Sequence, residues 1–156
     1  MIAIQRPGQS PLKIEFILID FEGTLATDRR VHPKAKDKIN LLSKRTKIYI
    51  LTTGGEERVS EVLRNVRAEV RFLKEGEASQ GKMNLLEQLG PDRVAAIGNG
   101  LDDISLIEKA GLGIAVMNTE GTAAEVIQKA DLVFTNTVDA LDFLLKPLRQ
   151  RATLSK

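Results

Sequence analysis

The sequence contains no cysteine and no tryptophan, and it has only one histidine and one tyrosine. Without cysteine, the chain can form neither a disulfide framework nor a thiolate metal site. No apolar run approaches the length of a membrane span, and residues 1–8 hold no apolar core long enough for a signal peptide. We therefore expect a cytoplasmic protein that does not enter a membrane.

The net charge of the chain is also small. The chain has 23 Lys and Arg residues against 21 Asp and Glu residues, which leaves a formal net charge of +2. This balance does not favour a nucleic acid or a membrane surface as partner, and we expect neither. No linker, repeat or low-complexity segment divides the sequence, so we predict one domain over residues 1–156.

Apolar patterns typical of strands and helices alternate along nearly the whole chain. Strands are predicted at residues 12–20, 47–51, 70–73, 94–97, 112–116 and 132–134, and helices at residues 33–44, 59–66, 78–89, 104–110, 122–129 and 138–145. Strands that alternate with helices through short connections are typical of a parallel sheet with right-handed crossovers. The predicted fold is therefore α/β, a doubly wound parallel sheet in three α/β/α layers.

Three segments lie outside this alternation. Residues 2–4 are predicted to form a short strand and, with the strand that begins at Leu12, an N-terminal β-hairpin. Residues 26–31 are polar and are predicted to be a loop. The basic tail at residues 146–156 is predicted to be a solubilising end that follows the last helix.

The first buried strand ends at an aspartate, Asp20, which is expected to lie at the edge of the sheet. Its apolar residues run directly into Asp20 and then into a bend that contains Gly23. The carboxyl ends of strands are where open α/β sheets build ligand sites. Taken alone, the motif DFEGT at residues 20–24 is more often an aspartate that caps a turn. Its functional interpretation is a nucleophilic Asp20 that accepts a phosphoryl group, with Glu22 as general acid and base.

Polar residues also follow the second predicted strand, and a lysine precedes the fourth. Thr52 ends the second strand, and its hydroxyl, with the amides of Thr53 and Gly54, would hold phosphate oxygens. Lys82 lies near the start of the helix that leads to the strand at residues 94–97. Each feature alone has an ordinary explanation, as a turn or as a solvated lysine.

The motif GNGLDD at residues 98–103 is more specific. One aspartate would suffice as a helix cap, so the adjacent Asp102 and Asp103 indicate oxygen ligands for Mg²⁺. Asp20, Thr52 and this acidic pair all follow strands of one parallel sheet, so they are expected at the same edge. A nucleophile, a hydroxyl, a lysine and a metal-binding pair are the groups that phosphoryl transfer needs.

The order of these motifs resembles that of the haloacid dehalogenase superfamily, and within it the soluble P-type ATPase-like phosphatases. The resemblance covers the chain from about Leu12 onwards and includes residues 111–116 and 130–135. It implies a Mg²⁺-dependent phosphohydrolase that forms an aspartyl-phosphate on Asp20 and acts on a phosphate ester. Thr52 and Lys82 would bind the phosphoryl group, and Lys82 would also offset the charge around Asp20.

The resemblance also implies a set of metal ligands and shows two departures from the family. Mg²⁺ would be held by Asp20, by the backbone carbonyl of Glu22 and by the fourth-motif residues Asn99, Asp102 and Asp103. Glu22 stands where most of these phosphatases have aspartate, and Asn99 stands where the fourth motif usually begins with aspartate. These departures motivate an alternative, a catalytically weakened domain that binds phosphate or a partner.

Two further conclusions come from what lies between the motifs. One helix separates the first two motifs, and a helix plus a strand separates the second from the third, so no cap domain is expected. An open site suits a macromolecular substrate or shielding by another subunit of a homo-oligomer. A two-component receiver domain is excluded, because it carries its acidic pair first, its phosphoacceptor later and its lysine last.

Overall fold

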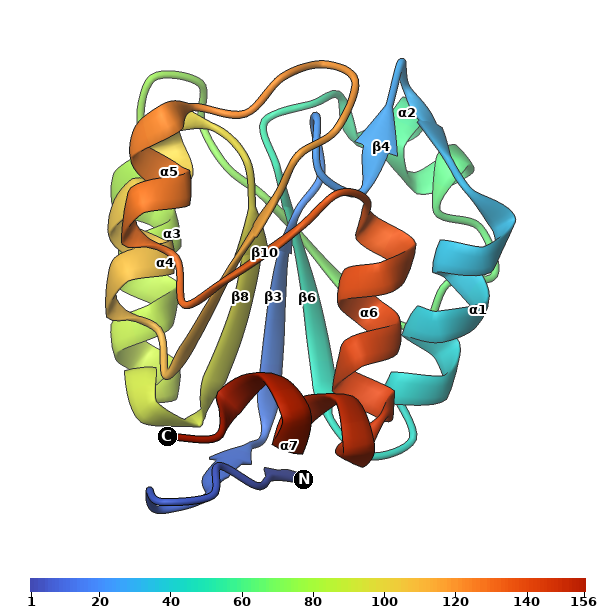
Figure 1. Ribbon diagram of the computed structural model, residues 1–156. Helices are drawn as coiled ribbons and strands as arrows, with labels where there is room; N and C mark the ends of the chain where they lie inside the picture. Colours follow the sequence, from blue (N-terminus) through green and yellow to red (C-terminus); the bar gives the residue numbers. More distant parts are fainter.

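A six-stranded sheet forms the centre of the molecule, and β3 lies in its middle. The computed structural model describes all 156 residues, Met1–Lys156. The strands follow the order β10-β9-β8-β3-β6-β7, and every neighbouring pair is parallel (Figure 1). Their bounds are Phe16–Asp20 for β3, Lys47–Thr52 for β6, Glu69–Phe72 for β7, Val94–Gly98 for β8, Leu112–Val116 for β9 and Leu132–Phe134 for β10.

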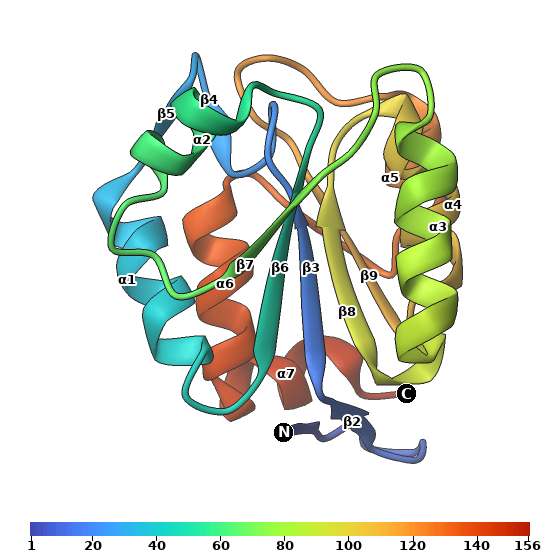
Figure 2. The ribbon, with the colours of Figure 1, turned by 180° about the vertical axis from the view of Figure 1, so that it is seen from behind.

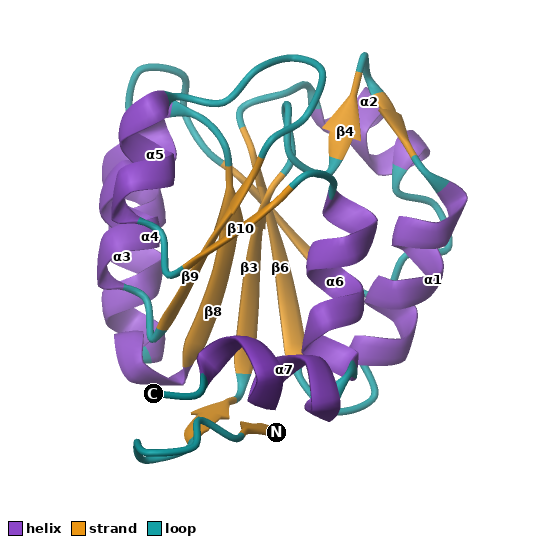
Figure 3. Ribbon diagram, in the orientation of Figure 1, coloured by secondary structure: helices purple, strands orange, loops and turns teal.

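Helices cover both faces of this sheet (Figures 2 and 3). One layer contains α1 (Pro33–Leu42), α2 (Glu56–Val62) and α6 (Thr137–Leu145), and the other contains α3 (Ala78–Leu89), α4 (Ile104–Lys109) and α5 (Ala124–Lys129). Alternate residues of β3 enter the two cores: Ile17 and Ile19 pack toward the first layer, and Leu18 packs toward the second. The predicted doubly wound, three-layer fold is confirmed.

The predicted N-terminal hairpin is present, but the strand that follows it is divided. β1 (Ile2–Ile4) pairs antiparallel with β2 (Leu12–Ile14), and β3 begins only at Phe16. The single strand predicted at residues 12–20 was therefore wrong. At the break, the amide of Glu15 donates to the Arg93 carbonyl at 2.9 Å and its carbonyl accepts from the Lys47 amide at 3.0 Å. The chain changes pairing partners here, from β1 to β6 and β8.

Residues 26–31, predicted to be a loop, form a small antiparallel hairpin. Its strands are β4 (Ala26–Thr27) and β5 (Arg30–Val31). Asp28 and Arg29 join them with φ angles of 50° and 65°. Positive φ at both central residues is the geometry of the tight hairpin turn, which Asn-Gly and Asp-Gly usually signal. The Asp-Arg pair carries that signal weakly, which is why the sequence pattern did not reveal it.

The basic tail is helical, so α6 is not the last helix. α7 (Pro147–Leu154) begins at Pro147, which the fixed φ of proline suits to a first helical turn. Gln150 is buried, and its side-chain amide donates to the Phe143 carbonyl at 2.9 Å. The chain end also contacts the N-terminal hairpin, where the Lys156 amide donates to the Pro7 carbonyl at 3.0 Å. Both termini lie at the edge of the sheet opposite the carboxyl ends of the strands (Figure 1).

The carboxyl edge of the sheet carries no inserted domain. Between β3 and β6 the chain forms only the β4–β5 hairpin and α1, and between β6 and β8 it forms α2, β7, α3 and a short 3₁₀ turn, η1 (Pro91–Arg93). A second 3₁₀ turn, η2 (Leu101–Asp103), follows β8. None of the helices has both the length and the apolarity needed to cross a membrane.

Candidate functional site

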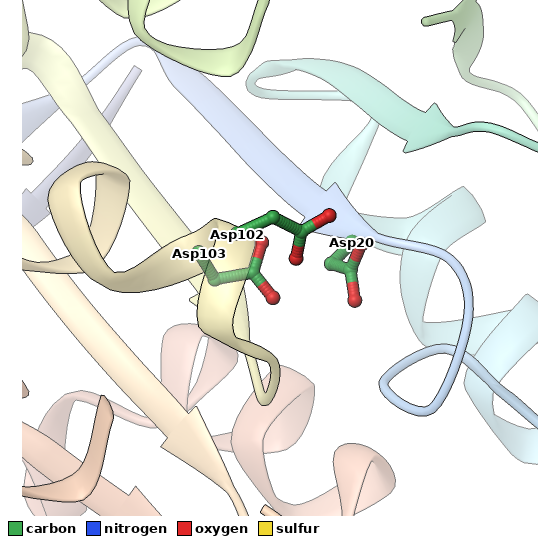
Figure 4. A group of neighbouring side chains, drawn as sticks. All are labelled: Asp20, Asp102 and Asp103. Atoms are coloured by element: carbon green, nitrogen blue, oxygen red, sulfur yellow. The ribbon is translucent and has the colours of Figure 1, made fainter. Parts of the chain in front are cut away.

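Three aspartates meet at the carboxyl edge of the sheet. Asp20 ends β3, and Asp102 and Asp103 lie in η2, directly after the neighbouring strand β8. One carboxylate oxygen from each lies within 4.8 Å of the others, and the side chains converge in Figure 4. Asp20 and Asp103 are 4% and 0% exposed, whereas 43% of the Asp102 side chain is exposed. The carboxyl groups of Asp20 and Asp103 are therefore buried, and the site is open to solvent at Asp102.

Lys82 completes this cluster from α3, which packs beside η2 and α4. It belongs to α3 and is 1% exposed. Its Nζ atom lies 2.9 Å from Asp20 Oδ1, 2.7 Å from Asp103 Oδ1 and 3.2 Å from Asp102 Oδ2. Three carboxylates against one ammonium leave a net charge of −2. Carboxylate oxygens with an excess of negative charge fit a hard divalent cation such as Mg²⁺.

Protonation in the cluster follows from its burial. Burial raises the pKa of Asp20 well above its usual range, the Asp103 carboxylate adds to this effect, and Lys82 opposes it. Burial likewise raises the pKa of Asp103 against the opposing effect of Lys82. Burial alone would lower the pKa of Lys82, but Asp20 and Asp103 outweigh it and raise the pKa. The lysine thus stays charged, but its single positive charge does not offset the effect of burial on the pKa values of Asp20 and Asp103.

We expect the metal-free protein to become more stable as the pH falls from neutrality. The folded-state pKa of Asp20 lies above the unfolded value of 3.8, so the folded chain binds this proton more tightly than the unfolded chain does. The free energy of unfolding should rise as the pH falls through the raised pKa, and the gain should be complete near 3.8. Urea unfolding at several pH values in EDTA measures this dependence of the free energy of unfolding on pH. Asp20→Asn should flatten the dependence, and equal slopes for the two proteins would contradict the assignment.

Thr52 and Glu22 form a second polar pair beside Asp20. Thr52 ends β6, the other neighbour of β3, and its hydroxyl donates to the Glu22 carboxylate. The Gly54 amide donates to Thr52 Oγ1 at 2.9 Å. A Cβ atom on Gly54 would lie 3.1 Å from both Glu22 Oε1 and Thr52 Oγ1, so the close approach favours glycine. Thr53 is exposed. The Glu22 side chain thus points to Thr52 and does not join the aspartate cluster.

The loop that follows Asp20 is closed on itself and held by Asn99. The Leu25 amide donates to the Asp20 carbonyl at 3.1 Å. The Thr24 hydroxyl lies 3.2 Å from Asp20 Oδ2 and 2.9 Å from Asn99 Oδ1. Gly23 has a φ of 76°, and a Cβ atom there would lie 2.5 Å from the Asn99 amide nitrogen. Asn99 therefore fixes this loop, and its metal coordination, like that of the Glu22 carbonyl, stays a prediction.

Two residues that sequence reasoning missed also hold this loop. Asn118, just after β9, donates through Nδ2 to the carbonyls of Gly23 and Thr24 at 2.9 and 2.8 Å. Thr137, the first residue of α6, donates its hydroxyl to the Thr24 carbonyl. The signal for Asn118 was its place behind a further strand of the same sheet. Thr137 offers a similar signal, because it follows β10 of the same sheet by three residues.

Fold and site together define an α/β protein with a cluster of three aspartates and a lysine at the carboxyl edge of a doubly wound sheet. The model of the haloacid dehalogenase-like hydrolases matches residues 81–141. An uncharacterized protein of Methanocaldococcus jannaschii is 38% identical over 84 residues, which cover 51% of this chain and 90% of that protein. The chain belongs to the haloacid dehalogenase-like hydrolases. Membership of the P-type ATPase-like group stays a prediction.

Solved structures resemble the chain over nearly its whole length. A putative hydrolase of the same superfamily (subfamily III A) from Legionella pneumophila has a TM-score of 0.72 at 19% identity and covers 90% of this chain and 87% of its own. The 3-deoxy-D-manno-octulosonate 8-phosphate phosphatase of Moraxella catarrhalis has a TM-score of 0.70 at 15% identity, with 90% and 89% covered. At these identities the likeness establishes the fold.

Proposed function

We propose that this protein is a Mg²⁺-dependent phosphohydrolase that forms an aspartyl-phosphate on Asp20 and acts on a phosphate ester. The observation that carries the proposal is the position of Asp20 at the end of β3, 2.9 Å from the buried Lys82 ammonium, within a cluster that has an excess of negative charge. The Moraxella catarrhalis phosphatase, which shares the fold, was crystallised with magnesium and phosphate ions.

The proposed reaction has two displacements at phosphorus. In the first, a carboxylate oxygen of Asp20 bonds to phosphorus as the ester P–O bond breaks, and Glu22 gives a proton to the leaving oxygen. In the second, Glu22 takes a proton from water, whose oxygen bonds to phosphorus as the Asp20 acyl phosphate breaks, which releases phosphate. A bound Mg²⁺ supplies positive charge for the phosphoryl oxygens.

The other residues of the site hold the phosphoryl group in this scheme. Lys82 contacts its oxygens with the ammonium that now faces Asp20 and Asp103. The Thr52 hydroxyl, with the amides of Thr53 and Gly54, receives a further oxygen in place of the Glu22 carboxylate, which it contacts now. That exchange would release Glu22 toward the leaving group. A cytoplasmic location and a homo-oligomeric state stay predictions.

A broad panel of phosphate monoesters, assayed with Mg²⁺ and with EDTA, tests the proposal directly. We expect phosphate release from at least one member of the panel in Mg²⁺ and none in EDTA. If no ester in the panel released phosphate, the enzymatic proposal would be wrong, and the weakened, phosphate-binding alternative would be favoured. Phosphate release that persists in EDTA would contradict the Mg²⁺ requirement but not the phosphohydrolase activity.

Glu22→Gln should lower turnover about 100-fold with little change in substrate affinity, because the amide can neither give nor take the catalytic proton. Glu22→Asp keeps the acid but shortens the side chain by one methylene, which displaces the carboxyl group from the leaving oxygen that it protonates in the proposed reaction. We therefore expect Glu22→Asp to lower turnover as well. Steady-state kinetics on a substrate found in the panel measure both variants. A large gain for Glu22→Asp would instead show that glutamate impairs this site.

Asn118→Ala should lower kcat about 10-fold or more and leave KM nearly unchanged, because it frees the two carbonyls that fix the loop behind Asp20. Thr137→Val should act in the same direction, and Thr137→Ser, which keeps the hydroxyl, should restore activity. Hydrogen exchange provides a second readout, since the amides of residues 23–26 should exchange faster in Asn118→Ala. Unchanged kcat together with unchanged exchange would contradict this positioning role.

A further inference from the structure

A cavity of about 630 Å³ lies behind the loop that carries Asp20. The β4–β5 hairpin, the first turn of α1, the first turn of α6 and Asn118 line it, none of the aspartates of the cluster does, and it is open to solvent at Arg30, His32 and Lys34. The volume lies within the range of small-molecule sites, about 300–1,000 Å³. The cavity shares Thr24, Asn118 and Thr137 with the contacts that hold the nucleophile loop, and no residue that binds or transfers the phosphoryl group in the proposed reaction lines it.

The ionisable side chains that line the cavity are all basic. Arg30, His32 and Lys34 line it, and no aspartate or glutamate does. The His32 Nδ1 atom accepts the Lys34 amide hydrogen at 3.0 Å, so a neutral His32 ring carries its proton on Nε2 and presents a donor there. A guanidinium, an ammonium and an imidazole donor without an acidic partner favour an anionic ligand.

The rest of the lining mixes apolar residues with the uncharged polar residues Thr24, Thr27, Asn118, Asn136 and Thr137, and it is continuous with the nucleophile loop. Leu25, Val31 and Val138 contribute hydrocarbon surface. Thr24 belongs to the same wall, and its hydroxyl lies 3.2 Å from Asp20 Oδ2 on the other side of the loop. A ligand that fits this cavity therefore combines an anionic group with an apolar body. It would bind next to the catalytic loop without contacting the aspartate cluster.

We propose that this cavity is a second, non-catalytic binding site for a small organic anion, one with a carboxylate or phosphate group on an apolar body. Its anionic group contacts Arg30 and Lys34, and its apolar part lies against Leu25 and Val138. The site is independent of turnover at Asp20, so it is tested by binding rather than by activity.

Benzoate and phenylphosphonate are suitable probes. Benzoate joins an aromatic ring to a carboxylate, and phenylphosphonate joins it to a phosphonate through a P–C bond that does not hydrolyse. Each is titrated into the ¹⁵N-labelled full-length protein in EDTA while amide NMR signals are followed. We expect saturable shifts for Thr27, Lys34 and Val138, with a dissociation constant in the millimolar range or tighter, and none for Thr53 or Gly100. Saturation by one probe alone identifies its anionic group as the preferred one.

The double variant Arg30→Gln with Lys34→Gln should weaken binding at least about tenfold, since it removes two charge-assisted contacts. Arg29→Gln with Lys36→Gln is the matched control: it changes the same hairpin and the same helix by the same charge, but neither residue lines the cavity. The control should bind as the wild type does. Equal weakening in both variants, shifts confined to Thr53 and Gly100, or no saturable shift with either probe would overturn the proposal.

Discussion

Asp20→Asn should lower phosphate release at least about 1,000-fold and leave the protein folded. An amide oxygen is a poor nucleophile toward phosphorus, so the covalent intermediate would not form. Asparagine nevertheless keeps the shape of the side chain and an oxygen that can accept from Lys82 Nζ, now 2.9 Å from Asp20 Oδ1. Because the change removes one of three clustered negative charges, the metal-free variant should unfold at the same temperature as the wild type or higher.

Asp102→Asn is the matched control for this experiment, since it removes the same charge from the same cluster. Asp102 is partly exposed and lies 3.2 Å from Lys82 Nζ, and the proposed reaction gives it no covalent role. We expect a loss of no more than about tenfold, which added Mg²⁺ largely reverses. In acid-quenched samples, wild type and Asp102→Asn should carry a labile phosphoryl group that Asp20→Asn lacks. Equal losses of phosphate release in the two variants would contradict the proposal that Asp20 is the nucleophile.

Local sequence signals were sufficient for most of the fold. The predicted bounds of α3 (Ala78–Leu89), β9 (Leu112–Val116) and β10 (Leu132–Phe134) agree with the structure residue for residue. The first two of these elements have a clear apolar pattern that ends near a glycine or another turn signal, and such patterns are local. Two predictions failed where a polar or basic composition hid regular structure, at the β4–β5 hairpin and at α7, and a third failed at Glu15, where the chain changes pairing partners within an apolar stretch.

The proximity of the candidate residues at one edge of the sheet was predictable from the sequence, but their contacts were not. The ends of β3, β6 and β8 had to meet because parallel neighbours share an edge, which brings Asp20, Thr52 and Asp103 together. Helical periodicity places Lys82 on the buried face of α3, three and four residues before Leu85 and Leu86, but that pattern does not give its carboxylate partners. The contacts of Asn118 and Thr137 with Thr24 span 94 and 113 residues, so no local pattern could reveal them. They became visible only when the chain was folded.

Lys82→Met should have the largest effect on stability. Lys82 is the one cation among three carboxylates, two of them buried, and methionine keeps much of its volume while it removes the charge. Breaking a buried ion pair on one side costs about 3–5 kcal/mol, because the remaining charge is left unpaired. We expect a loss of this size in the free energy of unfolding, measured with urea in EDTA. Lys109→Met, on the exposed side of α4, is the control and should be nearly neutral.

The cause of that loss can be separated from poor packing of methionine by restoring charge balance in two ways. Adding Mg²⁺ should stabilise Lys82→Met more than the wild type, because a cation at Asp20 and Asp103 replaces the lost ammonium. Combining Lys82→Met with Asp20→Asn should recover part of the stability, so the two changes should be less destabilising together than their sum. Additive changes, with no extra stabilisation by Mg²⁺, would mean that Lys82 contributes by packing. In that case charge compensation would not be what holds Asp20 and Asp103 together at the edge of the sheet.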